Sequence, residues 1–199
     1  MFTRPTGEEP AEAFSRALDQ LRSTRARREV VLTEVPAPQR IAPYAVALTA
    51  DVLSRAVPSG AEEPEELASG RFVLLHDPSA PEPWDSTFRA VTFVRAQLEP
   101  EFAADPLLGE VGWSWLLDAL ATRGASYTQD GGTVTRVVSQ SFGALKQRPD
   151  TVEIEVRGSW SPLDDDLGKH LAAWTDLLCT VAGLPPLPEG VAALPARRR

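Results

Sequence analysis

Hydrophobic and polar positions along the chain follow two periodicities, and each periodicity predicts a different kind of secondary structure. Apolar residues recur every three or four positions, the spacing of one helix face, in three segments: 9–28, 105–123 and 161–182. They alternate with polar residues, or form the short runs typical of strands, in five segments: 29–34, 44–52, 71–76, 87–98 and 151–160. The pattern therefore predicts three main helices and a sheet.

The segment 125–144 adds a predicted hairpin. Asp130, Gly131 and Gly132 form a strong turn signal between two strand-like runs. Strands thus cluster in sequence, and hairpin signals outnumber the crossover connections that parallel strands need. We expect an α+β fold with a single domain, in which an antiparallel or mixed sheet of about six to seven strands packs against three main helices.

The same pattern predicts how the chain is divided. Residues 1–28 are expected to form an N-terminal helix packed on the domain, and residues 29–184 the α+β core domain. Residues 185–199 are rich in proline and end in three arginines, which predicts an extended or disordered basic tail. Residues 57–70 are polar and acidic, with proline and glycine between, and predict an exposed loop.

The helix predicted over 105–123 is apolar on almost every face, which is typical of a helix buried between two surfaces. Trp113 and Trp115 lie two positions apart, so they point to different faces and cannot easily both pack on one sheet. One of them either reaches a groove or a dimer partner, or is covered by other elements of the same domain. Trp113, Trp115 and the loop residue Trp84 are therefore candidate partner-binding residues.

Composition narrows the classes of function. The net charge of −8 and the pI near 4.9 argue against general nucleic-acid binding and against adsorption to an anionic membrane. No window approaches the roughly 18 apolar residues of a membrane span, and the N-terminus lacks the apolar run of a signal peptide. The single cysteine, Cys179, can form neither an internal disulfide nor a zinc site of several cysteines, which favours a reducing cytoplasm.

Catalytic and cofactor signatures are missing from the sequence. Neither common glycine-rich phosphate loop occurs. Ser139, Ser141 and Gly143 match the nucleophile elbow only in part, because Ser139 takes the place of its first glycine. Two histidines, one cysteine and scattered carboxylates are a poor inventory for a metal site. We therefore expect no cofactor and no bound metal.

The third predicted helix carries two features of its own. Asp164, Asp165 and Asp166 fall in its first turn, where carboxylates meet free N–H groups and the positive end of the helix dipole. Capping therefore explains them better than a cation site does. His170, one turn before Trp174, is expected at the boundary of the core, half packed and half in solvent.

The loop HDPSAPEPWDSTFR, residues 76–89, holds the candidate active site. Residue types that serve acid–base chemistry lie close together there: His76, Asp77, Asp85 and Arg89. Its prolines stiffen the backbone and its aspartates can form turns with their own backbone, so each residue also has a structural role available. A catalytic role requires the four side chains to converge within hydrogen-bond reach beside a pocket.

Three stretches of the chain resemble a family of uncharacterised actinobacterial proteins, a domain of unknown function. They are WDSTFRAVTFVRAQLEPEFAADPLLGEVGWSWLLDAL, QDGGTVTRVVSQSFG and HLAAWTDLLCTVAGLPPLPEGV. The resemblance spans residues 29–195 and implies a bacterial cytosolic protein, but it carries over no activity and no catalytic residue.

We expect a cytoplasmic, non-catalytic module that binds a protein partner or forms a homodimer. The alternative is a small-molecule-binding protein or an enzyme that uses the loop 76–89. A nucleic-acid role for the arginine-ended tail ranks last, because the chain as a whole is acidic.

Overall fold

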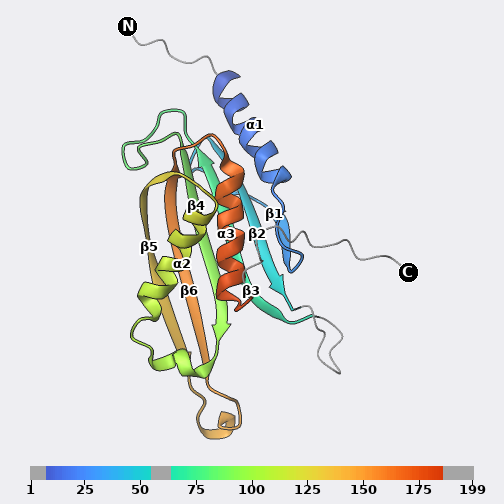
Figure 1. The fold of residues 1–199 in the computed structure, drawn as a ribbon, viewed down its shortest axis with the longest axis vertical. Coiled ribbons are helices and arrows are strands. Elements are labelled where there is room, and N and C mark those ends of the chain that lie inside the picture. The colour runs from blue at the N-terminus through green and yellow to red at the C-terminus, as the bar shows by residue number, and fades with distance from the viewer. Residues whose placement is uncertain (1–7, 55–63, 186–199) are drawn as a thin grey trace, which may run out of the picture.

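The structure, a computed structural model, describes residues 8–54 and 64–185. Residues 1–7, 55–63 and 186–199 are drawn as a grey trace in Figure 1. The predicted loop 57–70 therefore lies outside the described residues as far as residue 63, and it is wrong for residues 66–70, which form the start of a strand. The predicted basic tail lies outside the described residues beyond Pro185.

The described residues form an α+β fold, as predicted, with three α-helices and one antiparallel sheet of six strands. The α-helices are α1 (Glu8–Ser23), α2 (Leu108–Thr122) and α3 (Leu167–Val181). The strands are β1 (Val30–Val35), β2 (Tyr44–Leu53), β3 (Glu66–His76), β4 (Phe88–Leu98), β5 (Tyr127–Ser139) and β6 (Thr151–Pro162). Two short 3-10 helices, η1 (Pro100–Ala104) and η2 (Gly143–Leu145), lie in connections.

The sheet has the order β1-β2-β3-β4-β6-β5, and all three α-helices cover the same face of it (Figure 1). Helix α3 lies over the middle of the sheet, where it contacts β3 and β4, while α2 contacts β5 and β6. Helix α1 packs against α3 on the side of β1 and β2. We call the sheet face opposite the helices the open face.

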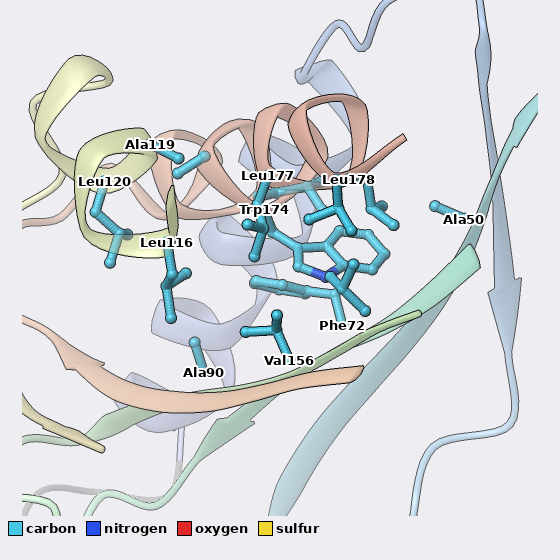
Figure 2. Close-up of a cluster of buried hydrophobic side chains, with 14 of the residues drawn as sticks. Ala50, Phe72, Ala90, Leu116, Ala119, Leu120, Val156, Trp174, Leu177 and Leu178 are labelled. Carbon is cyan, nitrogen blue, oxygen red and sulfur yellow. The ribbon is translucent and has the colours of Figure 1, made fainter. Parts of the chain in front are cut away.

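The main hydrophobic core lies between the sheet and the helices. Successive strand residues point to opposite faces, so alternate residues of β3 such as Phe72 and Leu74 reach this core and are fully buried. Trp174 of α3 packs on Phe72 with ring centroids 5.6 Å apart (Figure 2). Aromatic pairs at this separation stabilise a core beyond the area that they bury.

The predicted hairpin at 125–144 is wrong: the segment is one long strand, β5, and the chain reverses in residues 140–150 instead. Gln129 and Asp130 form a bulge, because the register with β6 shifts between Thr128 and Gly131. A side chain at Gly132 would meet the carbonyl oxygen of Arg157 and the indole of Trp113. Gly132 therefore serves close packing within a strand, and the glycine pair does not make a turn.

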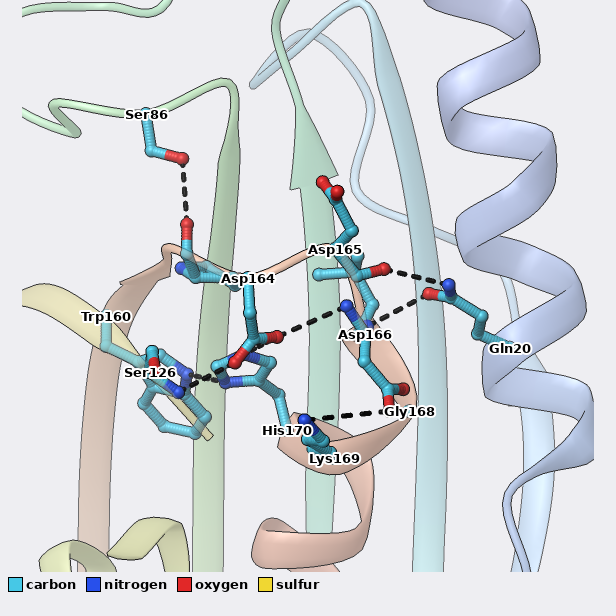
Figure 3. Close-up of polar contacts among 12 residues, drawn as sticks. Gln20, Ser86, Ser126, Trp160, Asp164, Asp165, Asp166, Gly168, Lys169 and His170 are labelled. Carbon is cyan, nitrogen blue, oxygen red and sulfur yellow. Dashed lines mark hydrogen bonds and ion pairs between the residues drawn. The ribbon is translucent and has the colours of Figure 1, made fainter. Parts of the chain in front are cut away.

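The start of α3 also differs from the prediction. Residues 161–162 end strand β6, and the helix begins at Leu167. Its first backbone N–H donates to the side-chain Oε1 of Gln20 on α1 over 2.9 Å, while Nε2 of Gln20 donates to the carbonyl oxygen of Asp165 over 2.8 Å (Figure 3). One side chain of a distant helix thus satisfies a free N–H group that we expected the aspartates to cap.

Asp164 instead binds the backbone around it. Its carboxylate accepts hydrogen bonds from the N–H groups of Ser126 and Asp166, at 2.8 and 3.2 Å. The predicted boundary position of His170 is wrong, because its ring is completely buried beneath this turn. Sequence spacing placed His170 near the core stripe, but only the packing of Trp160 and Asp164 around it removes it from water (Figure 3).

None of the helices in the described residues combines the length and the apolar character needed to cross a membrane.

Candidate functional site

The structure places His76 at the end of β3 on the helix side of the sheet. Its ring is 3% exposed and packs between aromatic rings, with centroids 4.3 Å from Phe88 and 6.2 Å from Phe14. Its Nδ1 lies 3.0 Å from the carbonyl oxygen of Thr87, within hydrogen-bond distance. These contacts explain the burial of the His76 ring at the edge of the main core.

The other three residues of the candidate active site lie in different surroundings. Asp77 accepts hydrogen bonds from the backbone N–H and the hydroxyl of Ser79, which closes a local turn. Asp85 is exposed and has a positive φ of 50°. Arg89 points to the open face, since it is one residue beyond Phe88, which contacts His76 on the helix side. The four side chains do not meet in one site.

The three tryptophans proposed for partner binding are all partly buried by the chain itself. Trp113 lies on the sheet above Gly132, and Trp115 packs against the main core beside α3. Trp84 lies on the open face, where it packs against a second small core of Ala47, Val73 and Leu75. Among the three, Trp84 is therefore the one that borders the open face.

Two rows of side chains cross the open face from strand to strand. The first row joins residues in register across all six strands: Val35, Ala47, Val73, Val91, Ser159 and Gly131. The second joins Thr33, Thr49, Arg71, Phe93, Arg157 and Thr133. The first row is apolar over four strands and ends in small residues, while the second sets an aromatic ring between two arginines.

These rows enclose a shallow hollow of about 730 Å³ over β3, β4, β6 and β5, which we call the trough. Its lining consists of Arg71, Val73, Val91, Thr92, Phe93, Gly131, Gly132, Thr133, Arg157, Gly158 and Ser159. Gly131 leaves open space at one side, because a side chain there would meet nothing within 4 Å. The trough therefore exists partly because β5 presents a glycine at this register.

The charged side chains that line the trough are basic, although the protein is acidic. Its lining holds two arginines and no carboxylate, although the chain has a net charge of −8. The Arg157 guanidinium lies 5.4 Å from the centre of the Phe93 ring and pairs with Glu155 at 2.8 Å. Arg71 donates to the carbonyl oxygen of Pro36 over 3.0 Å, and no ion pair to it is formed within the described residues. The lining can thus meet both an apolar group and an anion.

Arg89 borders the trough at its Ser159 end. Its guanidinium donates to the hydroxyls of Ser159 and Ser161, over 2.6 and 3.1 Å, and to the carbonyl oxygen of Gln129 over 2.7 Å. Partial burial lowers the pKa of Arg89 from its usual value, and the charge of Asp130 acts in the opposite direction. The three neutral acceptors hold this arginine in place and orient the Ser159 hydroxyl.

A second hollow, of about 530 Å³, lies between α2 and α3 and includes Trp115 and Cys179. Burial raises the pKa of the Cys179 thiol to about 11, so it is protonated at neutral pH and a poor nucleophile. Arg123 and Asp176 at its rim are joined by two hydrogen bonds. The described residues contain no group of three or more metal-ligating side chains. The polar groups of this hollow are thus less available to bind or react with a ligand than those of the trough.

Sequence reasoning did not find the trough. Arg71, Phe93 and Arg157 come from three strands and are separated by more than twenty residues each, so no local motif joins them. The signal available was alternation: Arg71 and Arg157 are exposed residues within strands that are otherwise largely buried. The strand order, which brings β4 between β3 and β6, could not be read from that signal.

Residues 10–192 match the model of a family described as "Protein of unknown function (DUF3000)", and the chain belongs to that family. Comparison with curated proteins and with solved structures gave no match.

Proposed function

We propose that this DUF3000 member is a non-catalytic, cytoplasmic binding module that holds an acidic, partly apolar segment of a partner protein in the trough. The observation that supports the proposal is the composition of the trough: a strip of valines beside Phe93, flanked by Arg71 and Arg157, without any carboxylate in the lining.

The apolar strip supplies the contact area. Val91 is 40% exposed on the open face although it lies on a central strand. A partner that covers exposed apolar side chains removes their surface from water, which favours binding by about 25 cal/mol per Å² of buried apolar area. Trp84 borders the same face and extends this surface toward the loop 76–89.

The arginines supply orientation and charge selection. Arg71 has no carboxylate partner within the described residues, and the Arg157 guanidinium remains largely exposed, with 61% of its side chain accessible. A guanidinium binds a carboxylate through two parallel hydrogen bonds, whereas it has no acceptor and a like charge to face in a partner's lysine. A partner with glutamates or aspartates on either side of an apolar residue therefore fits, and a basic partner is repelled.

The test uses two synthetic peptides of equal length, one with alternating leucine and glutamate and one with alternating leucine and lysine, each labelled with a fluorophore. Fluorescence anisotropy with the full chain is expected to show binding of the acidic peptide only, with an affinity that falls as salt screens the charges. Arg71→Glu and Arg157→Glu are each expected to weaken it about tenfold or more, which corresponds to about 1.4 kcal/mol.

Arg16→Glu is the matched control, because Arg16 is exposed on α1, on the other side of the sheet. This variant has the same change of net charge and is expected to bind as the unmodified chain does. Equal affinity for both peptides, or equal loss with Arg16→Glu and Arg71→Glu, would contradict the proposal, since either result would mean that binding does not depend on the trough.

A further inference from the structure

Strand β5 forms one edge of the sheet, and its outer side faces no other strand within the described residues. After the bulge, β5 pairs with β6 in unbroken register from Gly131 to Ser139. The backbone N–H and C=O groups on the outer side of such a strand are free to pair with another chain. A long regular edge strand can therefore add a strand from another chain more readily than a short or irregular one.

The opposite edge, β1, carries the features by which proteins usually protect an edge. It has only six residues, includes Glu34 and is followed directly by Pro36. Short length, charge and proline each hinder the addition of a further strand. The regular part of β5 is longer and lacks most of this protection: it contains no proline and no carboxylate, and its single charged residue is Arg136.

Exposed apolar side chains gather around the same edge. Eleven large hydrophobic side chains are exposed in the described residues, and seven of them lie between residues 102 and 145: Phe102, Leu107, Val111, Val137, Val138, Phe142 and Leu145. Arg136 donates to the carbonyl oxygen of Asp105 over 2.6 Å, which ties the segment before α2 to β5. Figure 1 shows α2 beside β5 at this end of the sheet. Concentrated apolar exposure marks an interaction surface.

We propose that a second copy of this chain covers the β5 edge, so that two β5 strands pair antiparallel and the two sheets become continuous. Charge selects this place for a second copy. Two chains of net charge −8 repel each other over most of their surfaces, and the segment Gly131–Ser139 offers a long edge with no carboxylate on it. Full overlap of that segment places Thr135 opposite Thr135 of the second copy, with each Arg136 opposite a Val134 and not opposite the other arginine.

This interface requires neither arginine of the trough, although residues 131–133 of the paired segment also form one side of the trough. The twofold axis that antiparallel pairing creates is the commonest symmetry of protein dimers. Val138 and the exposed side chains of the connection that follows β5 would lie beside the second copy and lose their contact with water.

The test measures the mass of the full chain by light scattering during size-exclusion chromatography over a range of concentrations up to about 100 μM, far above a micromolar Kd. The unmodified chain is expected to reach twice its 21.6 kDa. Val138→Lys is expected to leave a monomer, since it sets a charge on the edge. Val31→Lys is the matched control on the other edge strand, because Val31 and Val138 are both 45% exposed, and it is expected to remain a dimer.

A crosslinking experiment tests the register. In a Cys179→Ser background, Thr135→Cys is expected to form a disulfide between copies on mild oxidation, and Thr33→Cys on β1 is not. A monomer at every concentration, a dimer that Val138→Lys leaves intact, or a crosslink through Thr33→Cys in place of Thr135→Cys would each overturn the proposal.

Discussion

The indole N–H of Trp160 donates a hydrogen bond to Nδ1 of His170 over 2.9 Å, and both side chains are completely shielded from solvent. Because Nδ1 accepts this bond, the proton of the neutral ring is on Nε2, which faces the Asp164 carboxylate at 3.5 Å. The pair links the end of β6 to the first turn of α3. A protonated His170 could no longer accept from the indole, so the bond requires the neutral ring.

This bond predicts that acid destabilises the fold. Burial lowers the pKa of His170 below its usual 6.5, and this outweighs the opposing effect of Asp164. When the pKa of a base is lower in the folded state than in the unfolded state, the contribution of that base to folding stability is complete above the unfolded pKa. The contribution decreases as the pH falls below that value, because the unfolded chain then binds the proton more readily. The free energy of unfolding, measured with urea, is expected to fall between about pH 7.5 and pH 5.5, by at most about 1.4 kcal/mol per pH unit.

The control for this prediction is His170→Gln, which keeps a neutral acceptor in the core. We expect this variant to be less stable at about pH 7.5, since an imperfect acceptor costs roughly 1 to 3 kcal/mol, and to show a smaller loss on acidification. An equal pH dependence in both proteins would mean that other groups account for the acid sensitivity.

Adjacent glycines in β5 are predicted to respond differently to the same substitution. A Cβ on Gly132 would lie 2.0 Å from the carbonyl oxygen of Arg157 and 2.6 Å from the Trp113 ring, whereas one on Gly131 would meet nothing within 4 Å. Gly132→Ala is expected to lower the free energy of unfolding by about 2 kcal/mol or more. Gly131→Ala is expected to be neutral or slightly stabilising. Chemical denaturation of the two variants compares them, and equal stability would refute this packing.

Gln20 is predicted to contribute to stability as the cap of α3. Gln20→Ala removes the acceptor for the N–H of Leu167 and the donor to the Asp165 carbonyl. The expected loss is about 1 kcal/mol, similar to the loss of other cap residues. Asp19→Ala, at an exposed neighbouring position of α1, is the control and is expected to change the urea midpoint little. A similar shift in both variants would show that helix propensity, and not the cap, explains the loss.

The Cys179 thiol is predicted to be unreactive in the folded protein. Its side chain is 3% exposed and its pKa is raised to about 11, so roughly one thiol in a thousand is ionised at about pH 8. Reaction with a chromogenic disulfide reagent is expected to be at least about a hundredfold slower in native buffer than in denaturant. A fast reaction in native buffer would mean that the α2–α3 hollow opens to reagents.

The pattern of apolar positions was sufficient to predict most elements, because each of them buries one face. The alternation in 151–160 and the helical stripe ending near Val181 correspond to β6 and α3, with shifts of a few residues at their ends. The pattern failed at 125–144, where a turn signal lies within a strand. Glycine permits both a turn and close packing, and only the positions of the Arg157 backbone and the Trp113 ring beside Gly132 select the second.

The sequence by itself determined the fold class, the acidic charge and the absence of known catalytic signatures, since these depend on composition and on local periodicity. The tertiary structure alone decided which side chains share a surface. It separates His76 from Arg89, which are near in sequence but point to opposite faces of the sheet, and it brings Arg71, Phe93 and Arg157 together in register. The physical reason is that strand order and pleat, which set these neighbours, arise from long-range pairing that no local pattern encodes.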